Sequence, residues 1–460
     1  MEPKLFSKVL IANRGEIALR ILRACQELNI RTVVVHSTAD SDSMPVRLAD
    51  ESVCIGPAPS RDSYLNMRAI MSAAEITGAD AIHPGVGFLS ENSDFARMTQ
   101  EHSLHFIGAS PDLIDKMGDK IIAKVTMKKL GVPTISGSKG EIPSEEEALK
   151  QAELIGFPIL IKAASGGGGK GMKVAQNKEE VPQAWRLARH EALANFGNDQ
   201  VYMERYLQAP RHIEFQILAD AAGHVVCLGE RDCSIQRNHQ KIWEEAPALL
   251  PERLRKKMES TLIRATQKLG YVGVGTFEML LEDGQFYFME MNTRLQVEHT
   301  VTEMITGVDL VKEQIFAAAG FPLTFSQRDI TLKGHAIECR INAEDPNTFF
   351  PSPGLIKTYH PSGGPGVRVD SHVYSGYSVP PYYDSLLGKL IAYAPSREAC
   401  LAKIRRALQE FVVEGVATLI PLQKKLADHP DIIQANYDIH WLGRHLTQLV
   451  EEQENKRLLA

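Results

Sequence analysis

The most informative absences in this 460-residue sequence are those of long apolar runs, paired cysteines and excess positive charge. No run of about 18 apolar residues occurs, so the sequence predicts no membrane-spanning helix. The opening residues, Met1–Phe6, lack the apolar core of a secretory signal peptide. The six cysteines are scattered and form no C-x-x-C pair, which is typical of reduced thiols. These absences favour a cytoplasmic protein without a membrane partner.

Charge of neither sign dominates the sequence. It has 57 acidic and 51 basic residues, a net charge of −6, which argues against a nucleic-acid partner bound by bulk charge. The hydrophobic content of 44% and the charged content of 23% are ordinary for a globular protein. A chain of this length is expected to hold about two to four domains.

The N-terminal region predicts a parallel sheet. Lys8–Asn13 reads as a strand, Ile17–Leu28 repeats apolar residues at helical spacing, and Thr32–His36 reads as a second strand. This β-α-β order is typical of a parallel sheet covered by helices. A further strand, Ala79–Ile82, ends in the loop His83–Asn92, where such sheets commonly carry ligand contacts. A purely structural turn is the equally open alternative.

A glycine-rich loop lies between two predicted strands, Pro158–Lys162 and Met172–Ala175. Gly166–Gly169 precede Lys170 and Gly171, so the serine or threonine of a Walker loop is missing. Glycine lets backbone N–H groups approach an anion closely. We therefore predict a flexible hairpin lid over nucleotide phosphates, with Lys162 as a point charge for them. A solvated flexible loop is the alternative.

The lid is predicted to belong to a subdomain that spans Val132–Leu207. It contains helices at Ser144–Leu154 and Glu179–Ala194. The strand and turn at Val201–Leu207 could present backbone groups to an adenine ring, as at a hinge.

Two further stretches carry polar side chains that could face a ligand. His212–Leu218 alternates polar and apolar residues, which predicts a half-buried strand with His212, Glu214 and Gln216 on its polar face. Gly229–Lys241 is almost entirely polar and predicts a loop. The cationic side chains of this loop, which would suit an anionic substrate, are Arg231, Arg237, His239 and Lys241. An ordinary solvated loop is the alternative.

Gly275–Leu281 and Phe286–Asn292 predict a β-hairpin that carries Glu278 and Glu290. Carboxylates in an apolar hairpin are costly unless compensated, and a magnesium ion shared with triphosphate oxygens is the simplest compensation. A strict two-residue turn would put the two carboxylates on opposite faces of the hairpin. We therefore predict a three-residue loop, or an equivalent bulge, that brings Glu278, Glu290 and Asn292 to one face.

Polar residues continue at every second position after this hairpin. In an extended chain Asn292, Arg294, Gln296 and Glu298 share one face. An edge strand with its charges in solvent is one interpretation. Beside a magnesium-nucleotide site, a binding face for an oxyanion explains the row better.

Together these stretches resemble the biotin carboxylases, enzymes of the ATP-grasp superfamily, over about residues 4–443. The motifs that carry the resemblance, in their order, are Ile11–Glu16, His83–Gly85, the glycine loop, Phe288–His299, Glu338–Asp345 and Pro380–Ser385. Three positions depart from the family pattern. Lys170 stands where arginine is frequent, Val86 where tyrosine is usual, and Leu419 where asparagine is usual.

The resemblance implies a multidomain α/β and α+β fold in three parts. They are an N-terminal parallel-sheet (pre-ATP-grasp) domain over residues 4–118, an ATP-grasp domain over 119–320 and a C-terminal biotin carboxylase domain over 333–443. The mobile glycine-rich lid would span about 134–205 of the second part. The implied activity is that of a ligase forming a C–N bond, which uses ATP and bicarbonate to carboxylate biotin through carboxyphosphate.

The family pattern also implies which residues form the site. The implied ATP contacts are Lys120, Lys162, Gly168, Gly169, Glu204, Arg205, Tyr206, Leu207, His212, Gln236, His239, Glu278 and Glu290. The implied ligands of two Mg²⁺ or Mn²⁺ ions are Glu278, Glu290 and Asn292. The implied bicarbonate contacts are Lys241, Arg294, Gln296 and the Val297 backbone. The implied catalytic set is Lys241, Arg294, Glu298 as the base and Arg340, which would also face the biotin ureido oxygen.

The implied partners follow from what the chain lacks. It has no Met-Lys-Met acceptor motif and no carboxyltransferase-sized region after residue 443. We therefore expect a separate biotin carboxyl carrier protein and separate carboxyltransferase subunits, with this chain as a homodimer. Acetyl-CoA, leading to malonyl-CoA for fatty acid synthesis, is the favoured acceptor, and propionyl-CoA and pyruvate stay open.

Two different functions also stay open for a chain with these motifs. One is that of another ATP-grasp ligase, such as a carbamoyl-phosphate synthase half. The other is that of a nucleotide-binding regulatory protein without turnover. The set of Lys241, Glu278, Glu290, Arg294 and Glu298 argues against the second, because a degenerate site is expected to lose at least one of them.

Overall fold

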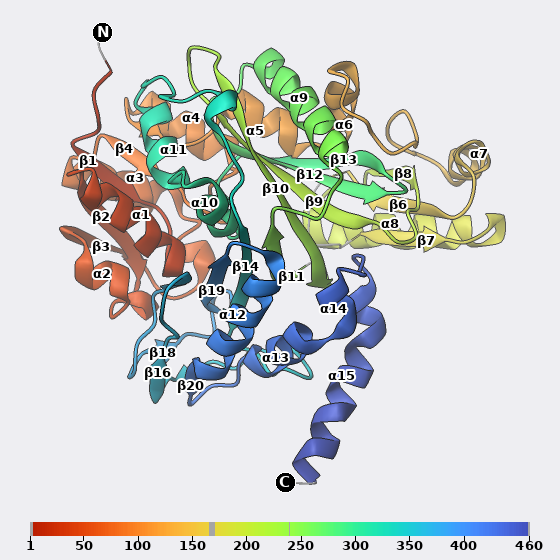
Figure 1. Cartoon of the computed structure of the whole chain (residues 1–460). Coiled ribbons are helices and arrows are strands. Elements are labelled where there is room, and N and C mark those ends of the chain that lie inside the picture. The colour runs from red at the N-terminus through yellow and green to blue at the C-terminus, as the bar shows by residue number, and fades with distance from the viewer. Residues whose placement is uncertain (1–2, 165–170, 239, 459–460) are drawn as a thin grey trace.

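The computed structural model describes residues 3–164, 171–238 and 240–458 (Figure 1). Its N-terminal part is a parallel sheet with the strand order β3-β2-β1-β4-β5, which confirms the predicted β-α-β unit. The strands are β1 (Lys8–Ile11), β2 (Arg31–Ser37), β3 (Glu51–Gly56), β4 (Ala81–His83) and β5 (His105–Phe106). The helices are α1 (Gly15–Glu27), α2 (Met44–Leu48), α3 (Met67–Thr77), α4 (Ser93–Glu101) and α5 (Pro111–Gly118).

The lid forms a separate small layer at the right of Figure 1. After α6 (Lys120–Lys129), its elements are α7 (Glu145–Ile155), β6 (Ile159–Ala163), β7 (Met172–Ala175), α8 (Val181–Phe196) and β8 (Val201–Arg205). Strand β6 pairs antiparallel with β7 and with β8, so the predicted strand-loop-strand arrangement is confirmed. Ile159, Ile161 and Met203 pack between this sheet and the two helices. The four glycines of the loop lie outside the described residues.

An antiparallel sheet forms the centre of the molecule, in the order β13-β12-β9-β10-β11-β14-β19-β17. Its strands are β9 (Arg211–Ala219), β10 (Val225–Arg237), β11 (Gln240–Ala246), β12 (Gly273–Glu282), β13 (Gln285–Asn292), β14 (His335–Asn342), β17 (Val367–Ser371) and β19 (Leu386–Ala394). The helices between them are α9 (Glu252–Leu269), α10 (His299–Thr306) and α11 (Leu310–Ala318). Because β11 pairs with β14, one sheet joins the middle part of the chain to the C-terminal region.

The rest of the C-terminal region covers one end of this sheet. Its short strands are β15 (Gly354–Leu355), β16 (Thr358–His360), β18 (Ser378–Val379) and β20 (Val412–Glu414). Its helices are α12 (Arg397–Glu410), α13 (Ile420–Asp428), α14 (Pro430–Gln434) and α15 (Trp441–Leu458). Short 3₁₀ turns occur at Thr38–Asp40, Ser60–Asp62, Lys178–Glu180 and Gln327–Asp329. Ile404 of α12 packs with Leu390 and Ile337 in a core cluster of its own.

Two expectations for the central sheet were wrong. Gly229–Lys241 is not a loop but the hairpin formed by β10 and β11. Strand β9, expected to be half-buried, is buried on both faces from His212 onward. Both errors have the same cause, because the polar side chains of these strands find partners within the sheet. Arg231, for example, is fully buried and donates to Glu214.

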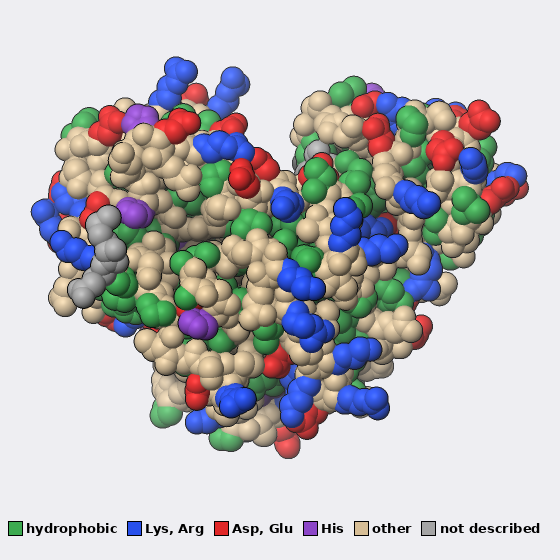
Figure 2. All heavy atoms as spheres, turned by 90° about the horizontal axis from the view of Figure 1, so that it is seen from above, with side chains coloured by type: hydrophobic (Ala, Val, Ile, Leu, Met, Phe, Trp, Pro, Cys, Tyr) green, Lys and Arg blue, Asp and Glu red, His purple; other side chains and the backbone are tan. Residues whose placement is uncertain are grey.

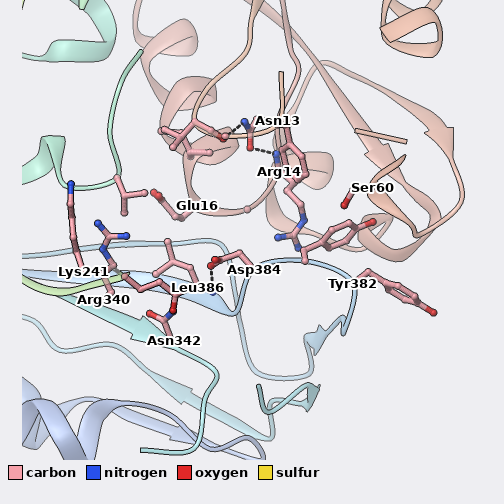
Figure 3. Close-up of a pocket in the computed structure, with 18 residues that line it drawn as sticks. Asn13, Arg14, Glu16, Ser60, Lys241, Arg340, Asn342, Tyr382, Asp384 and Leu386 are labelled. Carbon is pink, nitrogen blue, oxygen red and sulfur yellow. Dashed lines mark hydrogen bonds between the residues drawn. The ribbon is translucent and has the colours of Figure 1, made fainter. Parts of the chain in front are cut away.

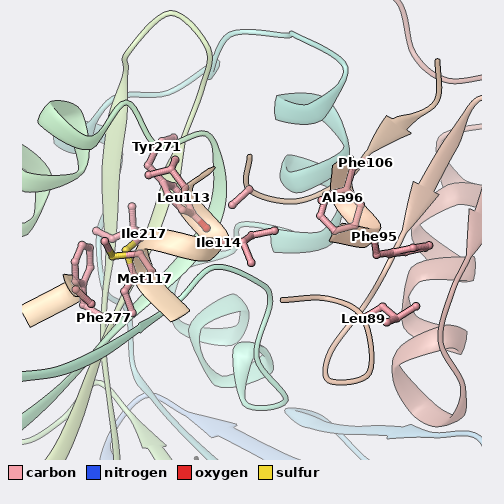
Figure 4. Packing of buried hydrophobic residues seen from close by; sticks show 14 of the residues in the cluster. Leu89, Phe95, Ala96, Phe106, Leu113, Ile114, Met117, Ile217, Tyr271 and Phe277 are labelled. Atoms are coloured by element: carbon pink, nitrogen blue, oxygen red, sulfur yellow. The ribbon is translucent and has the colours of Figure 1, made fainter. Parts of the chain in front are cut away.

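Hydrophobic packing joins the N-terminal sheet to the central one. Figure 4 shows Phe95 and Phe106 on one side of this core and Ile217 and Phe277 on the other. Ile114 of α5 lies between them, and all five side chains are buried. The relative position of the two sheets is therefore set by side-chain packing, which interiors hold at crystal-like density.

The surface is hollowed between two lobes when viewed from above (Figure 2). The left lobe contains the N-terminal sheet and the right lobe contains the lid, as comparison with Figure 1 shows. Among the residues that the structure describes, no helix combines the length and the apolar character needed to cross a bilayer.

Candidate active site

A cavity of about 360 Å³ lies between the lid and the central sheet. The lid contributes Leu160 and Met172 to its wall, and the N-terminal region contributes Val86. Many of the residues expected at the site line it together: Lys120, Lys162, His212, Gln236, Lys241, Glu278, Glu290, Asn292, Arg294, Gln296, Val297, Glu298 and Arg340. The tertiary structure thus gathers side chains from all three parts of the chain around one space.

The hairpin β12–β13 brings the two carboxylates to the same face. Its turn has two residues, Asp283 and Gly284, both with positive φ (50° and 72°), so the expected three-residue loop is wrong. The equivalent bulge is present instead, because the pairing register shifts between Glu278 and Met279. Glu278 therefore stands directly opposite Glu290. Cross-strand partners point to the same side of a sheet, which is the arrangement that a shared metal ion requires.

The electrostatics of this pair fit a divalent cation. Burial raises the pKa of Glu290, and the neighbouring Glu278 carboxylate raises it further. The Lys120 ammonium lies 3.6 Å from Glu290 and compensates only in part. The Asn292 amide nitrogen donates to Glu278 Oε1 at 2.9 Å, and its oxygen accepts from Arg294 at 2.7 Å. Carboxylate and amide oxygens are the ligands that Mg²⁺ prefers, and the charge of Glu290 is compensated only in part.

The residues after β13 converge on the carboxylates although they do not form a strand. Strand β13 ends at Asn292, and the chain turns before α10 begins at His299. Gln296 nevertheless donates to Glu278 Oε1 at 2.7 Å, and Arg294 donates to Asn292 Oδ1 at 2.7 Å. The expected extended chain was wrong, and so was the edge strand with charges in solvent, since Gln296 and Glu298 are buried.

Lys241 and Arg340 enclose the Glu298 carboxylate from two sides. Lys241 Nζ lies 2.6 Å from Glu298 Oε1 and 3.1 Å from Glu278 Oε1, and it also contacts Glu214. Arg340 Nη2 lies 3.0 Å from Glu298 Oε2. Burial alone would raise the pKa of Glu298, but the Lys241 and Arg340 charges hold this pKa below its ordinary value. Glu298 is therefore ionised at neutral pH and able to accept a proton.

A positive charge lies behind the carboxylates at His212. Its Nε2 is 3.1 Å from Glu214 Oε1 and 3.3 Å from Glu278 Oε2. Burial lowers the pKa of an imidazole, but the Glu278 carboxylate outweighs it and raises the pKa of His212 to about 9. The ring is therefore cationic at neutral pH, which suits a wall that faces phosphate oxygens.

The segment expected to take adenine lines a second space, of about 650 Å³. Arg205, Tyr206 and Leu207 line it together with Leu280 and Ile439. The amides of Arg205 and Tyr206 already donate to backbone carbonyls of Ser136 and Pro158. For an adenine ring, this segment therefore provides mainly an apolar wall and the atoms around Leu207.

The Glu204 side chain forms two ion pairs that the sequence does not predict. It is buried, and its carboxylate lies 2.7 Å from Lys124 Nζ and 2.8 Å from Lys162 Nζ. Sequence patterns give no reason to single out Lys124, because only the fold brings α6 against β8. Glu204 thus holds two lysines together, and one of them, Lys162, lines the first cavity.

A cavity of about 460 Å³ opens beside the first (Figure 3). The turn at Asn13–Arg14, the helix start at Glu16 and the loop at Tyr382–Asp384 line it. The residues that line both cavities are Val86, Gln240, Lys241, Val297 and Arg340. The motifs around Ile11–Glu16 and Pro380–Ser385 are visible in the sequence, but their place at one cavity follows only from the fold.

Some expected site residues either are not described or do not line the first cavity. Gly168, Gly169 and His239, as well as Lys170, lie outside the described residues. Arg231 is buried within the sheet and donates to Gln216 and Gln296, so it positions site residues without reaching the cavity. Arg237 lines the 650 Å³ space, and its guanidinium lies 3.9 Å from the centre of the Phe349 ring. Of the three described cations from the stretch expected to be a loop, Lys241 is the one that the structure brings to Glu278 and Glu298.

A small lid covers the central antiparallel sheet, and paired carboxylates and lysines lie between the lid and the sheet. This arrangement is that of the ATP-grasp class of ATP-dependent ligases. Family models agree with this class along the chain. Residues 5–114 match the biotin carboxylase N-terminal domain, and residues 338–444 match the biotin carboxylase C-terminal domain. Between them, residues 119–326 match the ATP-binding domain of the carbamoyl-phosphate synthase L chain. The chain belongs to the biotin carboxylase family.

Individual relatives cover nearly the whole chain. Biotin carboxylase of Haemophilus influenzae is 55% identical, over 96% of this chain and 99% of the relative. A crystal structure of the Campylobacter jejuni biotin carboxylase with a β,γ-ATP ligand aligns with a TM-score of 0.94 and 49% identity, over 96% of this chain and 99% of that one. The biotin carboxylase domain dimer of Hydrogenobacter thermophilus 2-oxoglutarate carboxylase, with MgADP and bicarbonate, gives a TM-score of 0.93 and 46% identity, over 96% and 98% of the two chains.

Proposed function

We propose that this enzyme uses ATP and bicarbonate to carboxylate biotin carried on a separate protein, through carboxyphosphate. The observation that carries this proposal is the position of Glu298 between Lys241 and Arg340, where the two cavities meet. One cavity then holds the nucleotide and the other the biotin ring. A reactive carboxyl group formed at their junction has a short path between them.

The bicarbonate ion binds beside Lys241, Arg294, Gln296 and the Val297 backbone. Glu298 is ionised and takes the bicarbonate proton, because a carboxylate with a lowered pKa is in its basic form at neutral pH. The deprotonated ion attacks the γ-phosphorus of ATP and gives carboxyphosphate and ADP. Lys120, Lys162 and the His212 imidazolium line the same space and neutralise charge on the phosphoryl oxygens.

Glu278, Glu290 and Asn292 would hold Mg²⁺ or Mn²⁺ at this site. The metal, when bound, neutralises phosphate charge and orients the γ-phosphoryl group for in-line attack. The lid strands β6 and β7 supply Leu160, Lys162 and Met172 to the wall, so the lid limits the access of water to carboxyphosphate.

The biotin ring occupies the 460 Å³ cavity beside the first one. Arg340 lines both cavities and carries a full positive charge, held by Glu244 at 2.6 Å and by Glu298. A guanidinium at this place stabilises the enolate-like oxygen of a deprotonated ureido group. Carbon dioxide released from carboxyphosphate then reacts with the ureido nitrogen, and the proton leaves with phosphate.

The purified chain tests this proposal directly. With ATP, bicarbonate and free biotin, we expect ADP release that depends on bicarbonate, and N-carboxybiotin as product. ADP release that ignores biotin at every concentration would favour a different ATP-grasp ligase. The absence of any bicarbonate-dependent turnover would favour a nucleotide-binding regulatory protein.

The charge of Lys241 sets a pH dependence. Glu298 acts as a base only when ionised, so turnover exists above its pKa and is lost as the pH falls through that pKa. Lys241 is the main cation that holds the pKa of Glu298 below 4.5 against the effect of burial. We expect Lys241→Gln to raise this pKa and to move the acid limb of kcat/KM for bicarbonate to higher pH.

Lys241→Arg is the matched control for this pH profile. It retains the charge beside Glu298, so its acid limb is expected to stay with that of the parental enzyme even if the rate falls. An acid limb that does not move in Lys241→Gln would contradict the assignment of Glu298 as the base.

We propose further that the chain works as a homodimer with a biotin carboxyl carrier protein and separate carboxyltransferase subunits, with acetyl-CoA as the final acceptor. Support comes from the stand-alone relatives that align end to end with this chain, such as that of Haemophilus influenzae. Relatives in 2-oxoglutarate and pyruvate carboxylases keep other acceptors open. Capture of the biotinylated partner, followed by an assay of acetyl-CoA, propionyl-CoA and pyruvate, identifies the acceptor.

A further inference from the structure

Two cations stand side by side on the C-terminal part of the central sheet. Arg340 on β14 is the direct cross-strand neighbour of Lys389 on β19, so both side chains point to the same face. Arg340 reaches the cavities, whereas Lys389 is completely buried. A lysine is rarely buried without a specific partner, which makes the contacts of Lys389 informative.

Each cation holds one of two adjacent residues of the site. Arg340 Nη2 donates to the Glu298 side chain at 3.0 Å. Lys389 Nζ donates to the Val297 backbone carbonyl at 2.8 Å. Two side chains on one face of the sheet therefore bind the Glu298 side chain and the peptide group that precedes it. Val297 itself lines both cavities.

Glu16 completes this arrangement from the other side. Its Oε2 lies 3.1 Å from Lys389 Nζ, and its side chain is buried in the first turn of α1. Figure 3 shows Glu16 between the Asn13–Arg14 turn and Arg340, where it lines the 460 Å³ cavity. The ion pair thus connects the N-terminal helix, the C-terminal strand and the peptide that carries the predicted base.

The Val297 peptide is a part of the chain whose orientation needs such support. It follows the turn after β13 and precedes the first turn of α10, where Glu298 is the N-cap residue. The neighbouring carbonyl of Gln296 accepts from the His299 amide at 3.3 Å, within the helix start. The Val297 carbonyl instead points to Lys389, so the direction of this peptide depends on a residue about 90 positions away in the chain.

We propose that Glu16 and Lys389 form a positioning pair that orients the Val297–Glu298 peptide for bicarbonate. Lys389 holds the carbonyl and Glu16 holds Lys389, so that the base and the backbone around Val297 present a preformed face to the oxyanion. This inference rests on the proposed function. It adds two positioning residues, neither of which touches ATP or bicarbonate. Because the pair spans the junction of three regions, correct docking of those regions is required for correct placement of the base.

The test compares the kinetics of three variants with those of the parental enzyme. Lys389→Met removes the donor, and we expect kcat/KM for bicarbonate to fall by about 10²-fold, the scale of a 1 Å misplacement of a reacting group. The KM for ATP is expected to stay within about twofold, since Lys389 lies away from the nucleotide wall. Glu16→Gln keeps Lys389 in place less firmly and should cause a smaller loss of the same kind.

The double variant Glu16→Gln/Lys389→Met separates positioning from stability. It removes both charges of the pair, although the buried Glu338 also loses the Lys389 charge, so we expect its melting temperature to recover in part relative to Lys389→Met. Its bicarbonate kinetics are expected to stay impaired, because the carbonyl still lacks its donor. Recovery of the bicarbonate kinetics together with the melting temperature would show that the pair is merely structural, and would overturn the proposal.

An ion pair with a buried carboxylate, whose two residues line neither cavity, provides the matched control. Arg255 on α9 lies 2.7 Å from the buried Glu230. Arg255→Met should lower the melting temperature while leaving the KM for bicarbonate unchanged, and a bicarbonate defect there equal to that of Lys389→Met would also overturn the proposal. If the parental enzyme itself shows no bicarbonate-dependent ADP release, the proposed function fails. If the parental enzyme shows this activity and the variants have the same bicarbonate kinetics as the parental enzyme, this inference alone fails.

Discussion

Replacing Glu298 by glutamine is expected to lower kcat/KM for bicarbonate by about 10²–10⁴-fold, the usual contribution of a general base. The variant keeps the size of the side chain and loses only the basic oxygen. Lys241 and Arg340 would still face it, so bicarbonate and ATP would still bind. The rate of ADP release as a function of bicarbonate concentration, with the KM for ATP as a reference, measures the effect.

A matched variant separates this loss from a general loss of structure. Glu313 on the next helix, α11, is outside both cavities and has a partly buried carboxylate. Glu313→Gln is therefore expected to keep the parental rate. A Glu298→Gln enzyme that carboxylates biotin at the parental rate would disprove the role of Glu298, and with it the central step of the proposed mechanism.

Replacing Glu290 by glutamine is expected to weaken metal binding and to lower ATP turnover by about 10²-fold or more, because a metal supplies several kcal/mol of charge stabilisation. The variant also removes the repulsion between Glu290 and Glu278. Without bound metal, its melting temperature should therefore be equal to or above that of the parental protein. Titration of turnover and of melting temperature with Mg²⁺ gives both readouts.

Glu282 provides the control for the metal experiment. It lies on the same hairpin, and its carboxylate accepts from the backbone amides of Gln208 and Ala209 instead of facing Glu290. Glu282→Gln should leave the Mg²⁺ dependence unchanged. If Glu290→Gln requires no more Mg²⁺ than the parental enzyme, the metal does not bind between the two strands of the hairpin.

Local patterns predict much of the fold correctly. The apolar run before the glycines is β6, and the segment after them is β7, because short β-branched runs bounded by turn residues leave few alternatives. The polar stretch from residue 229 to residue 241 has the local pattern of a loop and is nevertheless a hairpin. Its polar side chains are satisfied by residues distant in sequence, such as Glu214 for Lys241, and local pattern carries no information about such partners.

The candidate site is predicted unevenly for the same reason. Glu278 and Glu290 stand out because two carboxylates in an apolar hairpin demand compensation. Whether they face one another depends on a bulge that shifts the register by one residue. Lys124 and Lys389 carry no such local signal, since their significance comes entirely from Glu204 and the Val297 carbonyl, which other segments bring to them.

The sequence alone determined the chemical inventory of this protein: the carboxylates, the cations, the glycines of the lid and the order of the motifs, which together point to a biotin carboxylase. The tertiary structure decided which of these residues lie close together. It joined β11 to β14, so that Lys241 and Arg340 meet on either side of Glu298. Side-chain identity is local, but charge interaction falls with distance, and only folding sets those distances.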